Sequence, residues 1–307
     1  MSSVNISLFA NFRIDSAERL QRMKDSFSSI LDINFLNYVV NIRGSLSHEA
    51  RCFIEHSISE RLIISTEEDA RGWMNQSLDL VEKLSADRIF IWVEDHIFVS
   101  SPKLFLETIE EAFYAGTDCL YYSYLTPAIT SQYTNLEIYK DGLYSRMYTI
   151  SHDSIKKNIP WIKGQSIYTS SMVTVVTKNR FTQRLSDFKG ELLRWPHETP
   201  FNFEQIWAFE RLNKVIIAIP KKELFVSIDD DLDFNYSLIS RGLYPNRINR
   251  DQLRIDEGLT KRFFISVKNN AKDKKLFFIG IIYSILKIFY FTIRYKICVH
   301  IILRFKR

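Results

Sequence analysis

The sequence predicts an α/β fold in which a mixed, largely parallel sheet is flanked by helices. Short apolar runs rich in β-branched and aromatic residues alternate with longer segments whose apolar residues recur at helical spacing. The chain has 307 residues, of which 46% are hydrophobic, so it can fill the core of a large domain. This composition excludes a disordered protein.

The first 125 residues read as strands and helices in turn. Strands are expected at VNISLFANF (4–12), FLNYVVNI (35–42), RLIIST (61–66), RIFIWVEDHIF (88–98) and DCLYYSYL (118–125). Helices are expected after Asp15, which forms a capping box with Glu18, and at residues 72–85 and 102–116. Strands that alternate with helices in this way imply parallel βαβ units.

The second half of the chain is more mixed. Residues 170–188 read as a strand that runs into a helix, and NFEQIWAFERLN (202–213) reads as a helix capped by Asn202. Two further strands are expected at KVIIAIP (214–220) and ELFVSI (223–228). No linker divides residues 1–260, so we expect one domain there and a separate tail over residues 261–307.

The cysteine content indicates a compartment, and the charge restricts the partners. The three cysteines lie far apart, which is typical neither of a disulfide framework nor of a zinc site, so we expect a reducing compartment. The N-terminus shows no signal-peptide pattern, so we expect the catalytic part to stay in the cytosol. Residues 271–307 hold nine lysines and arginines against one aspartate. Because the whole chain carries +5, the first 270 residues carry −3. An acidic body with an apolar tail argues against nucleic-acid binding.

A cluster of polar residues interrupts the apolar run at residues 88–98. Glu94, Asp95 and His96 follow directly on the strand pattern of residues 88–93. Ligands of open α/β sheets bind outside the carboxyl ends of the strands, so these side chains stand where a ligand is expected. Carboxylate oxygens with one imidazole suit Mn²⁺ or Mg²⁺, and a metal there would hold a diphosphate. Ordinary solvated charges at a strand end are the structural alternative.

Five segments, taken in order, resemble the nucleotide-sugar glycosyltransferases of the GT-A fold, in particular the inverting family-two type. The likeness covers roughly residues 4–235. SLFANFR is similar to the first strand of that family and its Tyr-Asn-Arg-like turn, and YVVNIRGS to the second strand and its turn. GWMNQSLDL resembles the helix before the metal strand, and IWVEDH the Asp-X-Asp motif. The segment from residue 204 to residue 229 resembles the Glu-Asp helix and the last two strands.

The resemblance implies roles for individual residues. It implies that Glu94, Asp95 and His96 bind the metal, and that Glu94 and Asp95 also contact the donor. The further donor-binding residues that it implies are Phe9, Asn11, Arg13, Asn41, Arg43 and Asn75. It places the general base that takes the proton of the acceptor hydroxyl at Glu204, with Glu198 in reserve. A first-turn Glu204 that only favours the helix dipole is the alternative.

The tail predicts where the enzyme works. Residues 276–293 are uncharged apart from Lys287, and basic residues are spaced among the aromatic and aliphatic ones, which suits a helix lying in a membrane interface. A spanning helix, which would hold Lys287 inside the hydrocarbon, and a soluble core helix are the alternatives. We therefore expect a hexosyltransferase-type enzyme at the cytoplasmic face of the cell membrane, peripheral or monotopic, acting on a lipid-linked or cell-envelope saccharide. The alternative is a non-catalytic, degenerate GT-A module that docks a partner at the membrane.

Overall fold

The computed structural model describes residues 5–66, 73–120, 137–150, 167–168, 173–188, 205–206, 215–229 and 237–245. These residues belong to the first of two units into which the chain divides, Met1–Pro245. The helices of this part are α1 (Ala17–Ser29), α2 (Ser47–Ser57), α3 (Trp73–Val81), α4 (Pro102–Tyr114) and α7 (Lys178–Phe188). The expected tail lies outside the described residues, and the expected boundary at residue 260 stays a prediction.

The strands form one large sheet and two short pairs. The large sheet contains β1 (Ile6–Arg13), β2 (Tyr38–Arg43), β3 (Leu62–Ser65), β4 (Arg88–Trp92), β6 (Cys119–Leu120), β7 (Glu137–Asp141), β8 (Ser145–Ile150), β10 (Thr174–Thr177) and β12 (Val215–Pro220). The short pairs are β5 (His96–Phe98) with β13 (Phe225–Ser227), and β9 (Ile167–Tyr168) with β11 (Gln205–Ile206).

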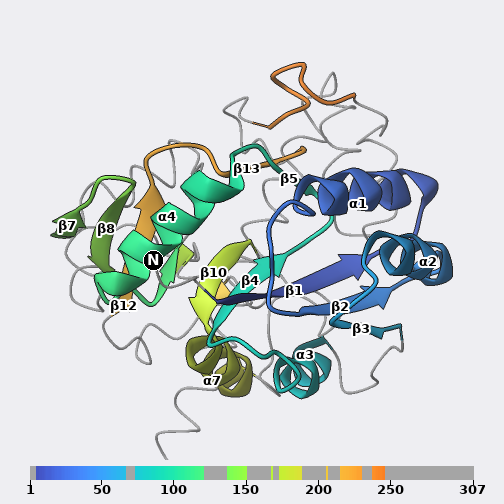
Figure 1. The fold of residues 1–307 in the computed structure, drawn as a ribbon, viewed down its shortest axis with the longest axis horizontal. Helices are drawn as coiled ribbons and strands as arrows, with labels where there is room; N and C mark the ends of the chain where they lie inside the picture. Colours follow the sequence, from blue (N-terminus) through green and yellow to red (C-terminus); the bar gives the residue numbers. More distant parts are fainter. Residues whose placement is uncertain are drawn as a thin grey trace, which may run out of the picture. The chain divides into compact units, whose positions relative to one another are not determined.

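The order of the strands indicates where a ligand would bind. The large sheet runs β3-β2-β1-β4-β10-β6-β12-β8-β7, and β1 to β4 are parallel. The chain builds outward from β1 through β2 to β3 and then crosses to the other side of β1 to form β4, so the strand order reverses between β1 and β4 (Figure 1). In open α/β sheets such a reversal point is where ligands bind, beyond the carboxyl ends of the two strands.

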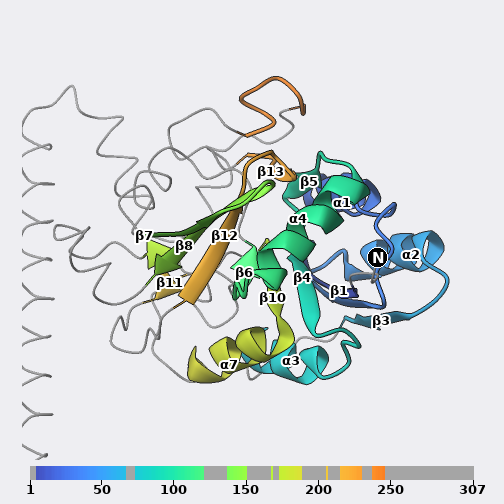
Figure 2. The same ribbon diagram turned by 60° about the vertical axis from the view of Figure 1, so that its left-hand side comes forward.

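Helices cover both faces of the sheet. Helices α3 and α7 lie side by side on one face, and α1, α2 and α4 lie on the other, as Figures 1 and 2 both show. Strand β4 is apolar almost throughout, because a central strand covered on both faces meets no water. Ile89, Phe90, Ile91 and Trp92 are fully buried, and the Phe90 ring contacts those of Trp92 and Phe105. The carboxyl end of β4 is therefore held on a rigid core.

The structure confirms the predicted strands over residues 6–13, 38–43, 62–65, 88–92 and 215–220, and it corrects two local predictions. The N-cap of α1 is Ser16, whose hydroxyl accepts from the Arg19 N–H at 3.2 Å, whereas Asp15 pairs with Arg13. Gln205–Ile206 is a strand paired with β9, where a helix was expected. The backbone groups of these residues form hydrogen bonds across the strand pair and not within a helical turn.

The described residues contain no helix long and apolar enough to cross a membrane.

Candidate functional site

The candidate site is the turn between β4 and β5, which holds Glu94 and Asp95. Two contacts fix its backbone: the Ile228 N–H donates to the Asp95 carbonyl at 2.7 Å, and the Ser26 hydroxyl donates to the Val93 carbonyl at 3.2 Å. The Trp92 indole N–H donates to the same Ser26 hydroxyl at 2.8 Å. Helix α1 and the segment after β13 thus hold the turn from two sides.

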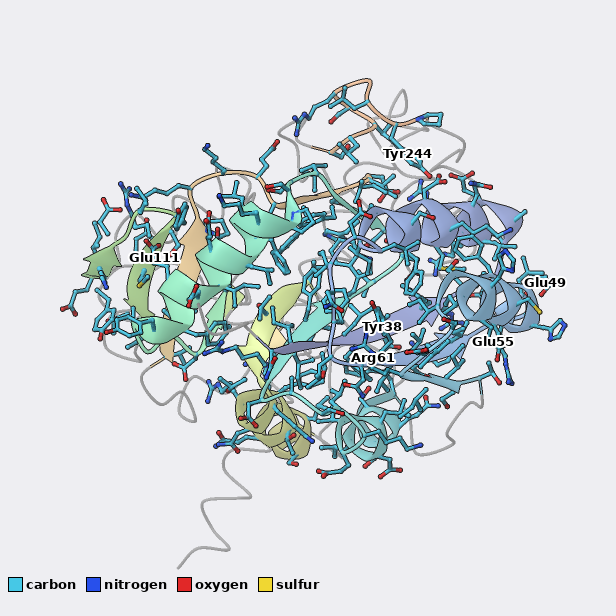
Figure 3. The ribbon with its side chains drawn as sticks, viewed as in Figure 1. Tyr38, Glu49, Glu55, Arg61, Glu111 and Tyr244 are labelled. Carbon is cyan, nitrogen blue, oxygen red and sulfur yellow. The ribbon has the colours of Figure 1, made fainter. Side chains whose placement is uncertain are left out.

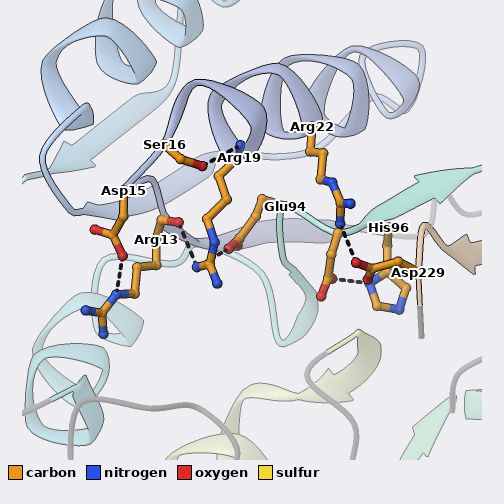
Figure 4. Close-up of polar contacts among 9 residues, drawn as sticks. Arg13, Asp15, Ser16, Arg19, Arg22, Glu94, His96 and Asp229 are labelled. Carbon is orange, nitrogen blue, oxygen red and sulfur yellow. Dashed lines mark hydrogen bonds and ion pairs between the residues drawn. The ribbon is translucent and has the colours of Figure 1, made fainter. Parts of the chain in front are cut away.

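Glu94 lies in a largely buried position beside the first turn of α1. Its side chain is 15% exposed, and its Oε1 lies 3.5 Å from Nη1 of Arg19, which also donates to the Arg13 carbonyl at 3.2 Å (Figure 4). Burial raises the pKa of the Glu94 carboxyl to about 7, and the negative charge of Asp95 adds to the rise, while Arg19 opposes it. Glu94 is therefore able to hold or release a proton near neutral pH.

Asp95 and His96 form a pair of their own. The distance from His96 Nδ1 to Asp95 Oδ1 is 2.6 Å, and Asp95 remains 45% exposed. Burial alone would raise the pKa of Asp95, but the neighbouring His96, Arg19 and Arg22 lower it further than burial raises it. Asp95 is accordingly an anion at neutral pH, oriented by the imidazole ring.

Arg22 is the most deeply buried charged group of the cluster. Its side chain is 4% exposed; its Nη1 donates to Asp229 Oδ2 at 2.8 Å, and its Nε donates to Glu18 Oε1 at 3.1 Å (Figure 4). Burial lowers the pKa of Arg22, but the two carboxylates outweigh that effect and raise it. The pair with Asp229 ties the segment after β13 to α1.

The cluster holds more carboxylates than guanidinium groups. Its ion pairs join five carboxylates, Asp15, Glu18, Glu94, Asp95 and Asp229, with three arginines, Arg13, Arg19 and Arg22, and with His96. Glu94, with a pKa of about 7, is only partly ionised at neutral pH, and His96 is a cation when it is protonated, so the negative surplus of the cluster is small.

The geometry, however, does not form a three-ligand metal site. Among the described residues, no group of three His, Cys, Asp or Glu side chains is placed to hold a metal ion. Glu94 extends toward Arg19, while Asp95 bonds to His96, so the three predicted ligands do not meet at one point (Figure 4). The hard oxygen ligands fit Mn²⁺ or Mg²⁺ chemically, but the arrangement does not fit either ion.

A buried layer of amides lies beside the turn, at the carboxyl ends of β1, β2 and β3. Asn11, Asn41 and Ser65 are aligned in register across the three strands. The Asn41 amide donates to Gln76 Oε1 of α3 at 3.1 Å and to Asn11 Oδ1 at 3.4 Å, and Gln76 donates to Ser65. Within the described part of the chain, Asn11 Nδ2 and Asn41 Oδ1 have no hydrogen-bond partner. Leaving a buried amide atom without a hydrogen-bond partner costs free energy.

The structure brings together some of the predicted site residues and separates others. Glu94, Asp95, His96 and Arg13 lie near the reversal point between β1 and β4, and Arg13 is exposed there. Asn11, Asn41 and Arg43 are buried beside it, and Asn75 is half-buried on α3. Phe9 belongs to the core, where its ring packs on Phe181 at 5.6 Å. The two candidate bases, Glu198 and Glu204, lie outside the described residues.

Three side chains of the candidate site were missed in the sequence: Arg19, Arg22 and Gln76. Arg19 and Arg22 are three residues apart, so they project from one face of α1 toward the turn. That spacing could be seen in the sequence. The sequence did not show which strand end this face of the helix contacts, because Arg19 and Glu94 are 75 positions apart.

No protein-family model matches the chain, and no curated protein matches it either. Among solved structures, the chain is similar to the fragment 1–349 of TarS from S. aureus, with 11% identity over 73% of this chain and 60% of that one and a TM-score of 0.44. It is also similar to the inositol-1-phosphate CTP transferase from T. maritima, with 13% identity over 76% of this chain and 94% of that one and a TM-score of 0.41.

The likeness to a second, longer TarS chain covers 75% of this chain and 38% of that one, at 12% identity and a TM-score of 0.43. This chain therefore spans less than two thirds of the TarS chains that it matches. At such identities and TM-scores these likenesses carry no argument about activity. The assignment of a mixed α/β fold rests on the strand order and helix layers described above.

Proposed function

We propose that the chain is a nucleotide-sugar-dependent glycosyltransferase that moves a sugar, of the hexosyl type, to a hydroxyl of a lipid-linked or cell-envelope saccharide. One observation carries the proposal: the Glu94–His96 turn and the buried amide layer lie together at the carboxyl ends of β4, β1 and β2, where the strand order reverses. A nucleotide sugar needs amide groups that hydrogen-bond to its base and charged groups that bind its diphosphate. The motif order from residue 4 to residue 229 supports the same reading.

The charge of the donor diphosphate has to be balanced at this turn. The guanidinium groups of Arg19 and Arg22 are already paired with carboxylates, so they do not compensate the charge of a diphosphate. For this reason we propose Mn²⁺ or Mg²⁺ as the cofactor, and the residues that would hold it are Glu94, Asp95 and His96, once their present contacts with Arg19 and with one another open. Such an ion would supply Lewis-acid stabilisation of the diphosphate charge.

The proposed base for the acceptor hydroxyl is Glu204, with Glu198 as the reserve, and inversion at the anomeric carbon follows from the same family resemblance. Glu204→Gln keeps the shape of the side chain and removes its basicity. We expect turnover to fall by about 10² to 10⁴-fold, the usual contribution of general-base catalysis, while donor affinity is retained. Full activity in Glu204→Gln together with a large loss in Glu198→Gln would move the role to Glu198.

The proposal is tested with a panel of uridine, guanosine, cytidine and thymidine diphosphate sugars. Binding is measured by calorimetry and hydrolysis by nucleotide release, with Mn²⁺, with Mg²⁺ and with a chelator. We expect one donor class to bind in a metal-dependent manner, and the double variant Asp95→Ala, His96→Ala to lose that dependence. The matched control is Glu55→Ala, because Glu55 lies on α2 in an exposed pair with Arg51, away from the turn.

A non-catalytic module that docks a partner at the membrane is the second candidate. The observation that favours it is the self-pairing of the site: Asp95 bonds to His96, and Glu94 lies against Arg19. Under this reading, no member of the panel is bound or hydrolysed with or without metal. The same screen therefore separates the two functions.

A further inference from the structure

Two serine hydroxyls of helix α1 bond to the backbone on both sides of the Glu94–His96 turn. The Ser26 hydroxyl donates to the Val93 carbonyl at 3.2 Å, directly before the turn. The Ser29 hydroxyl accepts from the Phe98 N–H at 2.9 Å, directly after it. The two serines are three residues apart, so a single turn of α1 contacts the chain on both sides of the candidate site.

Strand β5, which begins in the turn, has a strand partner on one side. In the described part of the chain it pairs with β13 alone. A strand with one neighbour directs some of its N–H groups away from that neighbour, and a buried N–H group needs an acceptor. The Ser29 hydroxyl is the acceptor for Phe98, which is itself buried. The serine therefore takes the place of a second neighbouring strand.

Ser26 is fully buried, at a position of α1 where an apolar residue would be usual. Its neighbours on the helix, Met23 and Phe27, belong to the hydrophobic core. Alanine favours a helix more than serine does, and it has no polar atom that needs a partner in the core. The hydroxyl is therefore explained by its contacts with the Trp92 indole and the Val93 carbonyl, and not by the helix.

Helix α1 has contacts of its own that fix it beside the turn. Arg22 Nη1 donates to Asp229 Oδ2 at 2.8 Å, and the Tyr244 hydroxyl donates to Asp25 Oδ2 at 2.5 Å. Tyr244 lies above the helix in Figure 3. Both partners of the helix belong to the segment that follows β13. A helix that is anchored independently of the turn can hold the turn in place.

We propose that Ser26 and Ser29 are positioning residues, which keep the backbone of the Glu94–His96 turn in the one conformation that a nucleotide sugar meets. The inference rests on the proposed function, because the side chains of this turn are those proposed to bind the donor diphosphate with its metal ion. Neither serine touches the donor. When one hydroxyl is removed, the turn relaxes into several conformations, and the donor binds only the molecules that hold the original one. The affinity falls in proportion to that fraction.

Ser29 offers the sharper test, because its side chain is only half-buried and threonine keeps the hydroxyl. Ser29→Ala and Ser29→Thr are compared with the unmodified full chain. The matched control is Ser28→Ala, since Ser28 is exposed on the same turn of α1. Three quantities are measured for each chain: hydrogen exchange at residues 94–98 without a donor, the affinity for the nucleotide sugar that binds best in the panel, and the free energy of unfolding in urea.

We expect Ser29→Ala to exchange faster at residues 94–98 and to bind the donor about tenfold more weakly, the effect of one lost hydrogen bond to a buried N–H group. Ser29→Thr should restore both properties, and Ser28→Ala should change neither. Ser26→Ala should weaken donor binding in the same direction. A Ser29→Ala chain that is less stable but binds the donor with unchanged affinity would show a structural role only and would overturn the proposal.

Failure of the proposed function has a different outcome, because the unmodified chain then binds no nucleotide sugar of the panel. The exchange at residues 94–98 is measured without a donor and does not depend on that result. Equal exchange rates in Ser29→Ala and the unmodified chain would show that the serine does not hold the turn, and would overturn the proposal in either case.

Discussion

At the scale of single residues, the site is defined by the oppositely charged partner of each charged side chain. Glu94 is compensated weakly, by one arginine at 3.5 Å, and its pKa rises to about 7; Asp95 is compensated by an imidazole at 2.6 Å, and its pKa falls. The sequence places both carboxylates at a strand end. It does not distinguish their pKa values, because those depend first on burial and also on the arginines of α1, which are distant in the chain.

The raised pKa of Glu94 predicts a specific dependence of stability on pH. Between the ordinary pKa of 4.5 and the folded-state value of about 7, the folded chain holds a proton on Glu94 that the unfolded chain has lost. The free energy of unfolding therefore falls as the pH rises through this window and is constant above it. Glu94→Gln should remove this part of the pH dependence, on the order of 2 to 3 kcal/mol at most.

The measurement is urea denaturation at pH 5 and pH 8. Glu55→Gln is the matched control, because Glu55 forms an exposed pair with Arg51 on α2 and should leave the pH dependence as it is. If Glu94→Gln lost as much stability between pH 5 and pH 8 as the unmodified chain, the carboxyl of Glu94 would have an ordinary pKa.

At the scale of the elements, a strand or helix with a clear local pattern could be predicted from the sequence. An element that depends on contacts with distant segments could not. Strands β1, β2, β4 and β12 were predictable because each is a buried apolar run. Helix α2 was missed, since its N-cap Leu46 makes no side-chain cap. Strand β7 was missed because EIYKD is exposed at every position and shows no alternation. Its stability comes from β8 and from Glu111, which no local pattern reveals.

The contact between Glu111 and the hairpin formed by β7 and β8 gives the second prediction. Glu111→Gln leaves one amide oxygen where two carboxylate oxygens accepted from three backbone N–H groups, so the hairpin should loosen at a cost of about 1 to 3 kcal/mol. Hydrogen exchange at the Leu143, Tyr144 and Ser145 amides should accelerate. Glu110→Gln, an exposed neighbour on the same helix, is the control. Unchanged protection of these three amides in Glu111→Gln would show that the strand pairing and the Lys221 N–H, which donates to the Tyr144 carbonyl at 2.8 Å, hold the hairpin alone.

At the scale of the whole molecule, the sheet order follows from patterns in the sequence only in part. Alternating strands and helices predict the parallel β1–β4 half, and the position of the site follows from it. The antiparallel insertion of β10 between β4 and β6 depends on packing between distant segments. The two candidate bases and the basic tail lie outside the described residues, so their roles remain predictions.

The tail supplies the third prediction. Truncation after Asn270 removes nine basic residues together with the apolar stretch around them. We expect the truncated chain to bind vesicles of phosphatidylcholine and phosphatidylglycerol at least tenfold more weakly in flotation, since each basic residue near the surface contributes about 1 kcal/mol. Its affinity for a nucleotide sugar should be unchanged. A truncated chain that floats with vesicles as well as the full chain would show that residues 271–307 are not the principal anchor.

A nucleotide sugar that binds at the carboxyl ends of β1, β2 and β4 should protect the backbone there. Hydrogen–deuterium exchange of the full chain is measured with and without the donor that binds best in the panel. We expect slower exchange in the backbone at residues 13–22, 41–46 and 93–97, with the α2 segment 50–57 as an internal reference that does not change. Protection that appears elsewhere while these three segments exchange as before, at a donor concentration that saturates binding, would show that the donor binds at another place.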